Sequence, residues 1–146
     1  MSNQMIHHRI SINAPMAMIW QYLTIPHLMK QWMLDQNTEL DIECDWQVGS
    51  SIVMKGKLHQ VKIENWGTIL EYEPEKKLSY TQLSSISRLP DVPESYYTLS
   101  FELTPSEEGN TLALTIRNFP TETIYKHLDF YWRGTLGILK ECAEDY

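Results

Sequence analysis

Residues 97–146 read YTLSFELTPSEEGNTLALTIRNFPTETIYKHLDFYWRGTLGILKECAEDY, and this stretch decides the fold. Its first part alternates apolar and polar residues from Tyr97 to Leu103, turns at residues 106–110 and alternates again up to Pro120, which predicts a β-hairpin. After the hairpin, apolar or small residues recur every three or four positions, at Ile124, Leu128, Tyr131, Thr135, Ile138 and Cys142. Such a stripe predicts a long amphipathic helix.

The start and the interior of this helix carry further signals. Thr121 is expected to cap its N-terminus, and Glu122 stands near the positive end of the helix dipole. Gly134 and Gly137 weaken a helix but permit another backbone to approach closely. We therefore expect the helix to begin just after Thr121, and its two glycines would permit close approach of another backbone.

The chain before the hairpin predicts a strand, two short helices and a run of further strands. Residues 8–12 alternate like a short strand, and Pro15 and Pro26 then each begin a short helix. From residue 40 onward the apolar residues follow period two in runs bounded by turn-forming residues, which predicts successive strands. Residues 84–94 form the longest irregular stretch and are a candidate lid.

This order of elements predicts the class α+β. Consecutive strands lack the crossover helices that parallel pairing requires, so the sheet must be antiparallel. The sheet has one apolar face and the long helix has one apolar stripe, and packing them together buries both. We predict a single domain over residues 1–146, in which a curved antiparallel sheet of about six or seven strands wraps around the C-terminal helix.

Composition argues against several classes of partner. Twelve Lys and Arg stand against 19 Asp and Glu, a net charge of −7, and the basic residues do not cluster as they do in nucleic-acid-binding proteins. The sequence has no apolar run long enough to span a membrane, and residues 1–10 have no apolar signal core. We expect a cytoplasmic protein that contacts neither nucleic acid nor membrane. Cys44 and Cys142 are compatible with two reduced thiols.

Motifs for catalysis, cofactors and metals give little support to an enzyme. The five histidines include no pair at metal-ligand spacing on one helix face, and we expect no metal. The sequence has neither a nucleophile elbow nor a phosphate-binding glycine loop, so we expect no cofactor and assign no catalytic residue. An acid–base pair built from distant residues, such as His59 with Glu71 or Tyr80, stays open.

Aromatic residues are the functional signal that stands out. Tyr and Trp rings can pack an apolar ligand while their hydroxyl and indole groups supply a few orienting polar contacts. The alternative is that these rings simply fill the space between sheet and helix. We predict a ligand cavity lined by Trp32, Met54, Tyr80, Gln82, Tyr97, Leu99, Leu128, Tyr131 and Trp132.

Several stretches resemble one protein superfamily. The segments INAP at 12–15, IW at 19–20 and PHL at 26–28, followed by Trp32, resemble the N-terminal part of SRPBCC-superfamily domains. These domains are also called START-like or Bet v 1-like. Four further segments resemble one branch of this superfamily, the branch homologous to the C-terminal domain of activators of the heat-shock protein 90 ATPase. These segments are GTILEYEP at 67–74, KLSY at 77–80, LSFEL at 99–103 and GNTL at 109–112. Ser50 departs from a doubled glycine that is frequent in the family, and Gln82 replaces an aromatic residue, which places a polar group toward the cavity.

The resemblance implies a helix-grip fold and three competing functions. The first is binding of a small hydrophobic molecule between the sheet and the C-terminal helix, without catalysis. The second is a co-chaperone-like interaction module, whose partner would be a chaperone. The third is an enzyme of the cyclase, aromatase or hydrolase kind that similar folds host. We rank them in this order and expect a monomer or a weak homodimer.

Overall fold

The computed structural model describes residues 4–33, 39–58, 60–107 and 109–145. In these ranges seven strands form one antiparallel sheet in the order β1-β7-β6-β5-β4-β3-β2. The strands are β1 (Met5–Ile12), β2 (Glu39–Cys44), β3 (Ser51–Leu58), β4 (Val61–Glu73), β5 (Lys77–Ser84), β6 (Tyr97–Ser106) and β7 (Gly109–Arg117). The helices are α1 (Met16–Thr24), α2 (Pro26–Met33) and α3 (Glu122–Glu144), with the short 3-10 turns η1 (Ser85–Ser87) and η2 (Pro93–Ser95).

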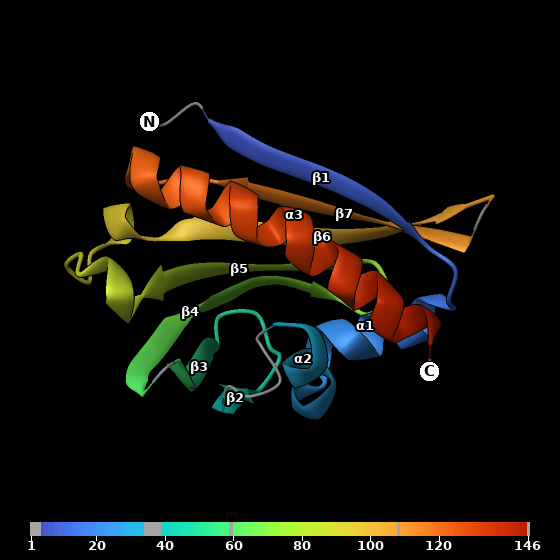
Figure 1. The fold of residues 1–146 in the computed structure, drawn as a ribbon, viewed down its shortest axis with the longest axis horizontal. Helices are drawn as coiled ribbons and strands as arrows, with labels where there is room; N and C mark the ends of the chain where they lie inside the picture. The colour runs from blue at the N-terminus through green and yellow to red at the C-terminus, as the bar shows by residue number, and fades with distance from the viewer. Residues whose placement is uncertain (1–3, 34–38, 59, 108, 146) are drawn as a thin grey trace.

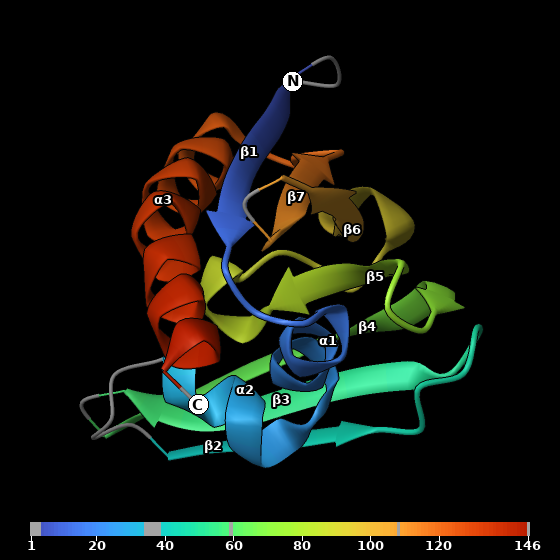
Figure 2. The ribbon, with the colours of Figure 1, turned by 90° about the vertical axis from the view of Figure 1, so that its right-hand side faces the viewer.

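The sheet curls around α3. In Figure 1, α3 crosses the face of the strands β5, β6 and β7, and α1 and α2 lie near its C-terminal end. Figure 2, turned by 90°, shows the sheet curving from β1 through β5 to β2, with α3 along its open side. The predicted helix-grip fold, with two short helices after the first strand, is confirmed.

The β6–β7 hairpin places the strongest alternation of the sequence against α3. Tyr97, Leu99, Phe101 and Leu103 are buried, and the residues between them are more exposed. Phe101 stands directly opposite Leu114 of β7, on the inner face of the sheet. Period two thus gives this hairpin one apolar face, which becomes half of the core.

The cap of α3 is confirmed, but its buried face differs from the predicted stripe. The Thr121 side chain accepts a hydrogen bond from the backbone N–H of Ile124 at 3.1 Å. Ile138, predicted to be buried, is 47% exposed, whereas Leu139 is fully buried. Counted from Ile124, four turns of about 3.6 residues end between Ile138 and Leu139, so the buried face of the helix can fall on Leu139.

Among the described residues, no other backbone comes close to the two helix glycines, although glycine would permit it. A Cβ added at Gly134 or Gly137 would have no neighbouring atom within 4 Å. Close approach occurs instead at Gly67 in β4, where a Cβ would stand 1.7 Å from the backbone oxygen of Thr81. Strand β5 therefore packs over Gly67 at a distance that a side chain would block.

Two further findings concern the described residues. No helix in these ranges combines the length and the apolar character that crossing a bilayer requires. Cys44 and Cys142 are both free thiols.

We expect opposite effects of alanine at two glycines. Gly134→Ala should raise the free energy of unfolding by about 0.5–1 kcal/mol, because alanine loses less backbone entropy in a helix interior and meets no neighbour here. Gly67→Ala should lower it by about 1–3 kcal/mol through overpacking. Urea denaturation measures both changes, and a destabilised Gly134→Ala would show that this helix face is covered.

Candidate functional site

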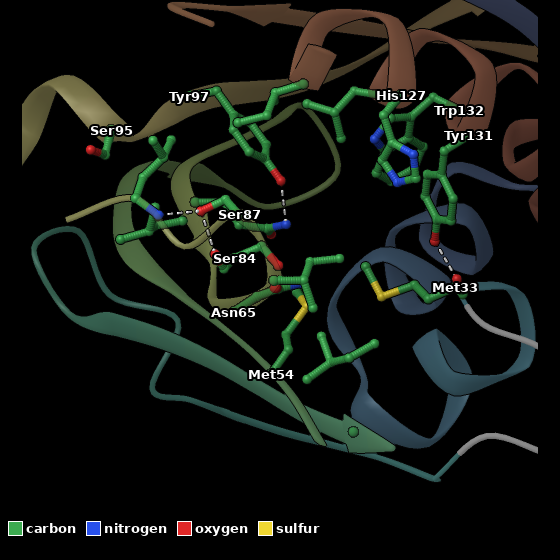
Figure 3. A pocket seen from close by; sticks show the side chains of 18 of the residues that line it. Met33, Met54, Asn65, Ser84, Ser87, Ser95, Tyr97, His127, Tyr131 and Trp132 are labelled. Carbon is green, nitrogen blue, oxygen red and sulfur yellow. Dashed lines mark hydrogen bonds between the residues drawn. The ribbon is translucent and has the colours of Figure 1, made fainter. Parts of the chain in front are cut away.

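A pocket of about 720 Å³ lies between the sheet and the N-terminal half of α3. Strands β2 to β6, the turns η1 and η2, and the end of α2 complete its wall. Figure 3 shows side chains from the strands on one side of this space and His127, Tyr131 and Trp132 from α3 on the other. The pocket therefore exists because α3 spans this part of the sheet without filling it.

Strand register explains which sheet residues reach the pocket. Met54 in β3 stands opposite Asn65 in β4, and Asn65 stands opposite Ser84 in β5. Residues directly opposite on neighbouring strands point to the same face, so these three form a row across the floor of the pocket. Gln82, two residues before Ser84, is on the same face and stands opposite Tyr97 in β6.

Most of the pocket surface is apolar. We call the following side chains the apolar wall: Met33, Leu40, Met54, Leu128 and Trp132. All of them are buried, and they come from α2, β2, β3 and α3. Methionine fills irregular space with a flexible and polarisable chain, so this wall can adapt to ligands of different shape.

Neutral polar side chains gather on the strand side of the pocket. We call Asn65, Gln82, Ser84 and Tyr97 the polar corner. The Gln82 side-chain amide donates a hydrogen bond to the Tyr97 hydroxyl at 2.7 Å, as the dashed line in Figure 3 shows. Among the described residues, the buried atoms Asn65 Oδ1 and Ser84 Oγ have no hydrogen-bond partner.

Three tyrosines of the pocket lining stay protonated at neutral pH. Burial raises the pKa of Tyr80 and of Tyr97 far above that of an exposed phenol, and the other tyrosines of the pocket contribute to the shift. Burial raises the pKa of Tyr131 to about 12. The Tyr131 hydroxyl donates to the backbone oxygen of Met33, which ties α3 to the end of α2. These phenols act as neutral hydrogen-bonding groups.

The structure brings together all of the predicted cavity residues except Trp32 and Leu99. Trp32 is buried between α2 and α3, where its indole N–H donates to the backbone oxygen of Tyr22 at 2.8 Å. Leu99 shares a face with Tyr80, directly opposite it, but lies 1% exposed in the filled part of the core. Whether the remaining residues bind a ligand stays a prediction.

Sequence reasoning missed Asn65, Ser84 and the part of the wall that the 84–94 segment supplies. Ser84 continues the face of Tyr80 and Gln82 by period two, but the sequence placed it in the following loop. Asn65 interrupts an apolar alternation, a signal of the same kind as Gln82. Ile86, Ser87 and Leu89 border the pocket, so the candidate lid lies beside it, and its opening stays a prediction.

The acid–base pair considered above, His59 with Glu71 or Tyr80, stays a prediction, because only its second members lie among the described residues. Glu71 is exposed and forms an ion pair with Lys77 at 3.3 Å, whereas Tyr80 lines the pocket. His59 lies outside the described residues. Within the described ranges, no group of three His, Cys, Asp or Glu is placed to hold a metal ion.

Solved structures with this fold come from several bacteria. A protein of Cytophaga hutchinsonii is 31% identical, with a TM-score of 0.82 over 99% of this chain and 97% of that one. A protein of Nitrosomonas europaea is 25% identical, with a TM-score of 0.76 over 94% of this chain and 92% of that one. The Aha1 dimer of Colwellia psychrerythraea is also 25% identical, with a TM-score of 0.72 over 97% of this chain and 96% of that one.

A comparison with curated proteins gives no significant match. The family described as "Activator of Hsp90 ATPase homolog 1-like protein" matches residues 13–144, which include both short helices, the whole pocket lining and all of α3. The chain belongs to this family.

Proposed function

We propose that this protein binds a small, mainly apolar molecule in the pocket between the sheet and α3. The observation that carries the proposal is the open volume of about 720 Å³ beside the apolar wall. Ligand pockets of drug-sized molecules typically measure about 300–1,000 Å³ and are lined mainly by apolar and aromatic groups with a few polar ones. The pocket has both the size and this division of its surface.

The packing of the aromatic rings supports binding over simple filling. Tyr80 stacks on Phe101 with ring centroids 6.3 Å apart, and Trp132 meets the edge of Phe101 at 5.7 Å. These rings pack against one another on one side of the pocket and leave its volume open. Protein interiors are otherwise close-packed, so an unfilled volume of this size supports the presence of a bound ligand.

The tyrosines and the polar corner favour binding over proton-transfer catalysis. An acid–base catalyst works best when its pKa lies near the working pH. The tyrosine phenols of the pocket have a pKa well above that range, and the other side chains of the polar corner are amides and a serine. Such groups orient a ligand by hydrogen bonds. We therefore place a binding protein ahead of the cyclase, aromatase or hydrolase alternative.

Filling the pocket should abolish binding. We expect the neutral dye N-phenyl-1-naphthylamine to bind the wild-type protein with increased fluorescence, and Leu128→Trp to weaken binding by about tenfold or more, because the larger ring enters the pocket. Phe130→Trp is the matched control, since Phe130 is on the same helix but 83% exposed. Fluorescence titration measures both variants.

Circular dichroism verifies that the filled variant folds, and Met54→Trp on the opposite wall provides a second filled pocket. Absence of dye binding by the folded wild-type protein would refute the proposal. Equal dye affinity in wild type and in both filled variants would also refute it, because the dye would then bind elsewhere.

Protein interaction is a second candidate function, favoured by the family match. The family description names activation of an Hsp90 ATPase, and one structural relative is described as an Aha1 dimer. Phe130 is 83% exposed and Ile138 is 47% exposed on α3, where a chaperone partner would cover them. Two expectations from the sequence remain predictions: a cytoplasmic location, and an oligomeric state of monomer or weak homodimer.

The two candidate functions make separate predictions. If the protein acts on an Hsp90-type chaperone, Phe130→Ser with Ile138→Ser should reduce stimulation of the chaperone ATPase at least severalfold, because the lost apolar contacts lie at the interface. Leu128→Trp should leave that stimulation unchanged, since it alters only the pocket. A steady-state ATPase assay measures both. No stimulation by the wild-type protein would exclude this function.

A further inference from the structure

Two buried hydrogen-bonding atoms in the pocket lining lack partners. Asn65 Oδ1 is an acceptor, and Ser84 Oγ can both donate and accept. Neither has a hydrogen-bond partner among the described residues, and both atoms are buried. Because the great majority of buried polar atoms are hydrogen-bonded, two unpartnered atoms in one pocket indicate that something else bonds to them.

The strand register places these two side chains together. Asn65 and Ser84 are directly opposite on β4 and β5, which brings their Cβ atoms to about 4.5–5.5 Å. Met54 stands opposite Asn65 on its other side and belongs to the apolar wall. A single ligand group at this point would therefore lie beside both polar side chains while the adjoining part of the ligand lies against Met54.

Tyr97 adds a donor to the same corner. Its hydroxyl oxygen accepts from the Gln82 amide at 2.7 Å, so the hydroxyl proton is available to another acceptor. Figure 3 shows this hydroxyl pointing toward the space that Ser84 and Asn65 border. The corner thus offers an acceptor at Asn65, a donor and acceptor at Ser84 and a donor at Tyr97.

We infer that the ligand carries a neutral group that both donates and accepts hydrogen bonds, such as a carboxamide or a hydroxyl, and that this group binds at Asn65, Ser84 and Tyr97 while the apolar body of the ligand lies on the apolar wall. The inference rests on the proposed function and specifies the chemistry of the ligand. It requires no reaction at the site.

The electrostatic surroundings explain why the group is neutral. Every side chain of the polar corner is uncharged, and a buried ionic group without an opposite charge is strongly disfavoured. Among the described lining residues, Lys57 carries a positive charge; it is exposed and comes from β3. A carboxylate would therefore be attracted to Lys57 rather than to the polar corner.

A purely structural role does not account for Asn65 and Ser84. Polar side chains that stabilise a fold do so through the hydrogen bonds they make. Ser79, a buried serine on the same strand as Ser84, makes such a bond with the hydroxyl group of Ser100 at 3.0 Å. Asn65 Oδ1 and Ser84 Oγ make none. Removing such groups should leave the melting temperature of the ligand-free protein unchanged or raise it.

A matched series of probes tests the inference. Naphthalene, 2-naphthamide and 2-naphthoate share an apolar body and differ in the polar end, and each is titrated as a competitor of N-phenyl-1-naphthylamine. We expect 2-naphthamide to bind wild type about tenfold more tightly than naphthalene, which corresponds to one or two net hydrogen bonds, and more tightly than 2-naphthoate. Ser84→Ala and Asn65→Leu should each reduce the amide advantage severalfold and change naphthalene affinity by less than twofold.

Ser51→Ala, at an exposed position in β3, is the matched control and should keep the full advantage. Equal binding of naphthalene and 2-naphthamide would overturn the inference and leave the proposed function standing, since the corner would then hold only water. Tightest binding of 2-naphthoate would overturn it in favour of an anionic ligand. Failure of every probe to bind, the dye included, would overturn the proposed function and this inference with it.

Discussion

Trp132 is buried where α3, the sheet and α2 meet. The centroid of its ring lies 5.7 Å from that of Phe101 and 5.2 Å from that of Tyr131, both in edge-to-face arrangements, and 6.0 Å from that of Trp32. Aromatic pairs at such distances favour particular relative orientations, so this cluster sets how far α3 stands from the sheet and in which direction it runs. The pocket depends on that spacing because its two sides are carried by α3 and the strands.

The pocket arises from an uneven distribution of side-chain volume on one continuous sheet. On β6 the inner face carries Leu99 and Phe101, which fill the space under α3. On β4 and β5 the corresponding face carries Asn65 and Ser84, which are smaller and polar. The same helix therefore packs tightly over one half of the sheet and spans the other half at a distance, and the fold needs no additional element to make a cavity.

The fold was largely readable from the sequence because its signals are local. Period two in β6 and β7, and period near 3.6 after Thr121, depend only on neighbouring residues. The lining of the pocket is a different kind of property. Trp32 and Leu99 are as apolar as the true lining residues, and packing between elements far apart in the sequence decides which buried side chains face open space.

In the polar corner and on the buried face of α3, local sequence patterns did not assign every residue correctly. Gln82 was recognised because it departs from an aromatic position of the family, but Ser84 lay just beyond the predicted strand, where period two was no longer applied. Ile138 was placed on the buried face because it lies about four turns after Ile124, but four turns of about 3.6 residues end between Ile138 and Leu139. An error of one residue along a helix or a strand therefore assigns a side chain to the wrong face of that element.

Long-range hydrogen bonds hold α3, the last element of the chain, against β1 and the residue that follows it. Asn13 donates its backbone N–H to Glu144 at 2.7 Å, Lys140 donates to the backbone oxygen of Ser11 at 2.6 Å, and His8 bonds to Asp129 at 3.1 Å. Because α3 follows every strand of the sheet in the chain, a ribosome completes the whole concave surface before its cover has been made. A ligand of the proposed kind would meet an open concave sheet in that interval, and α3 would cover it afterwards.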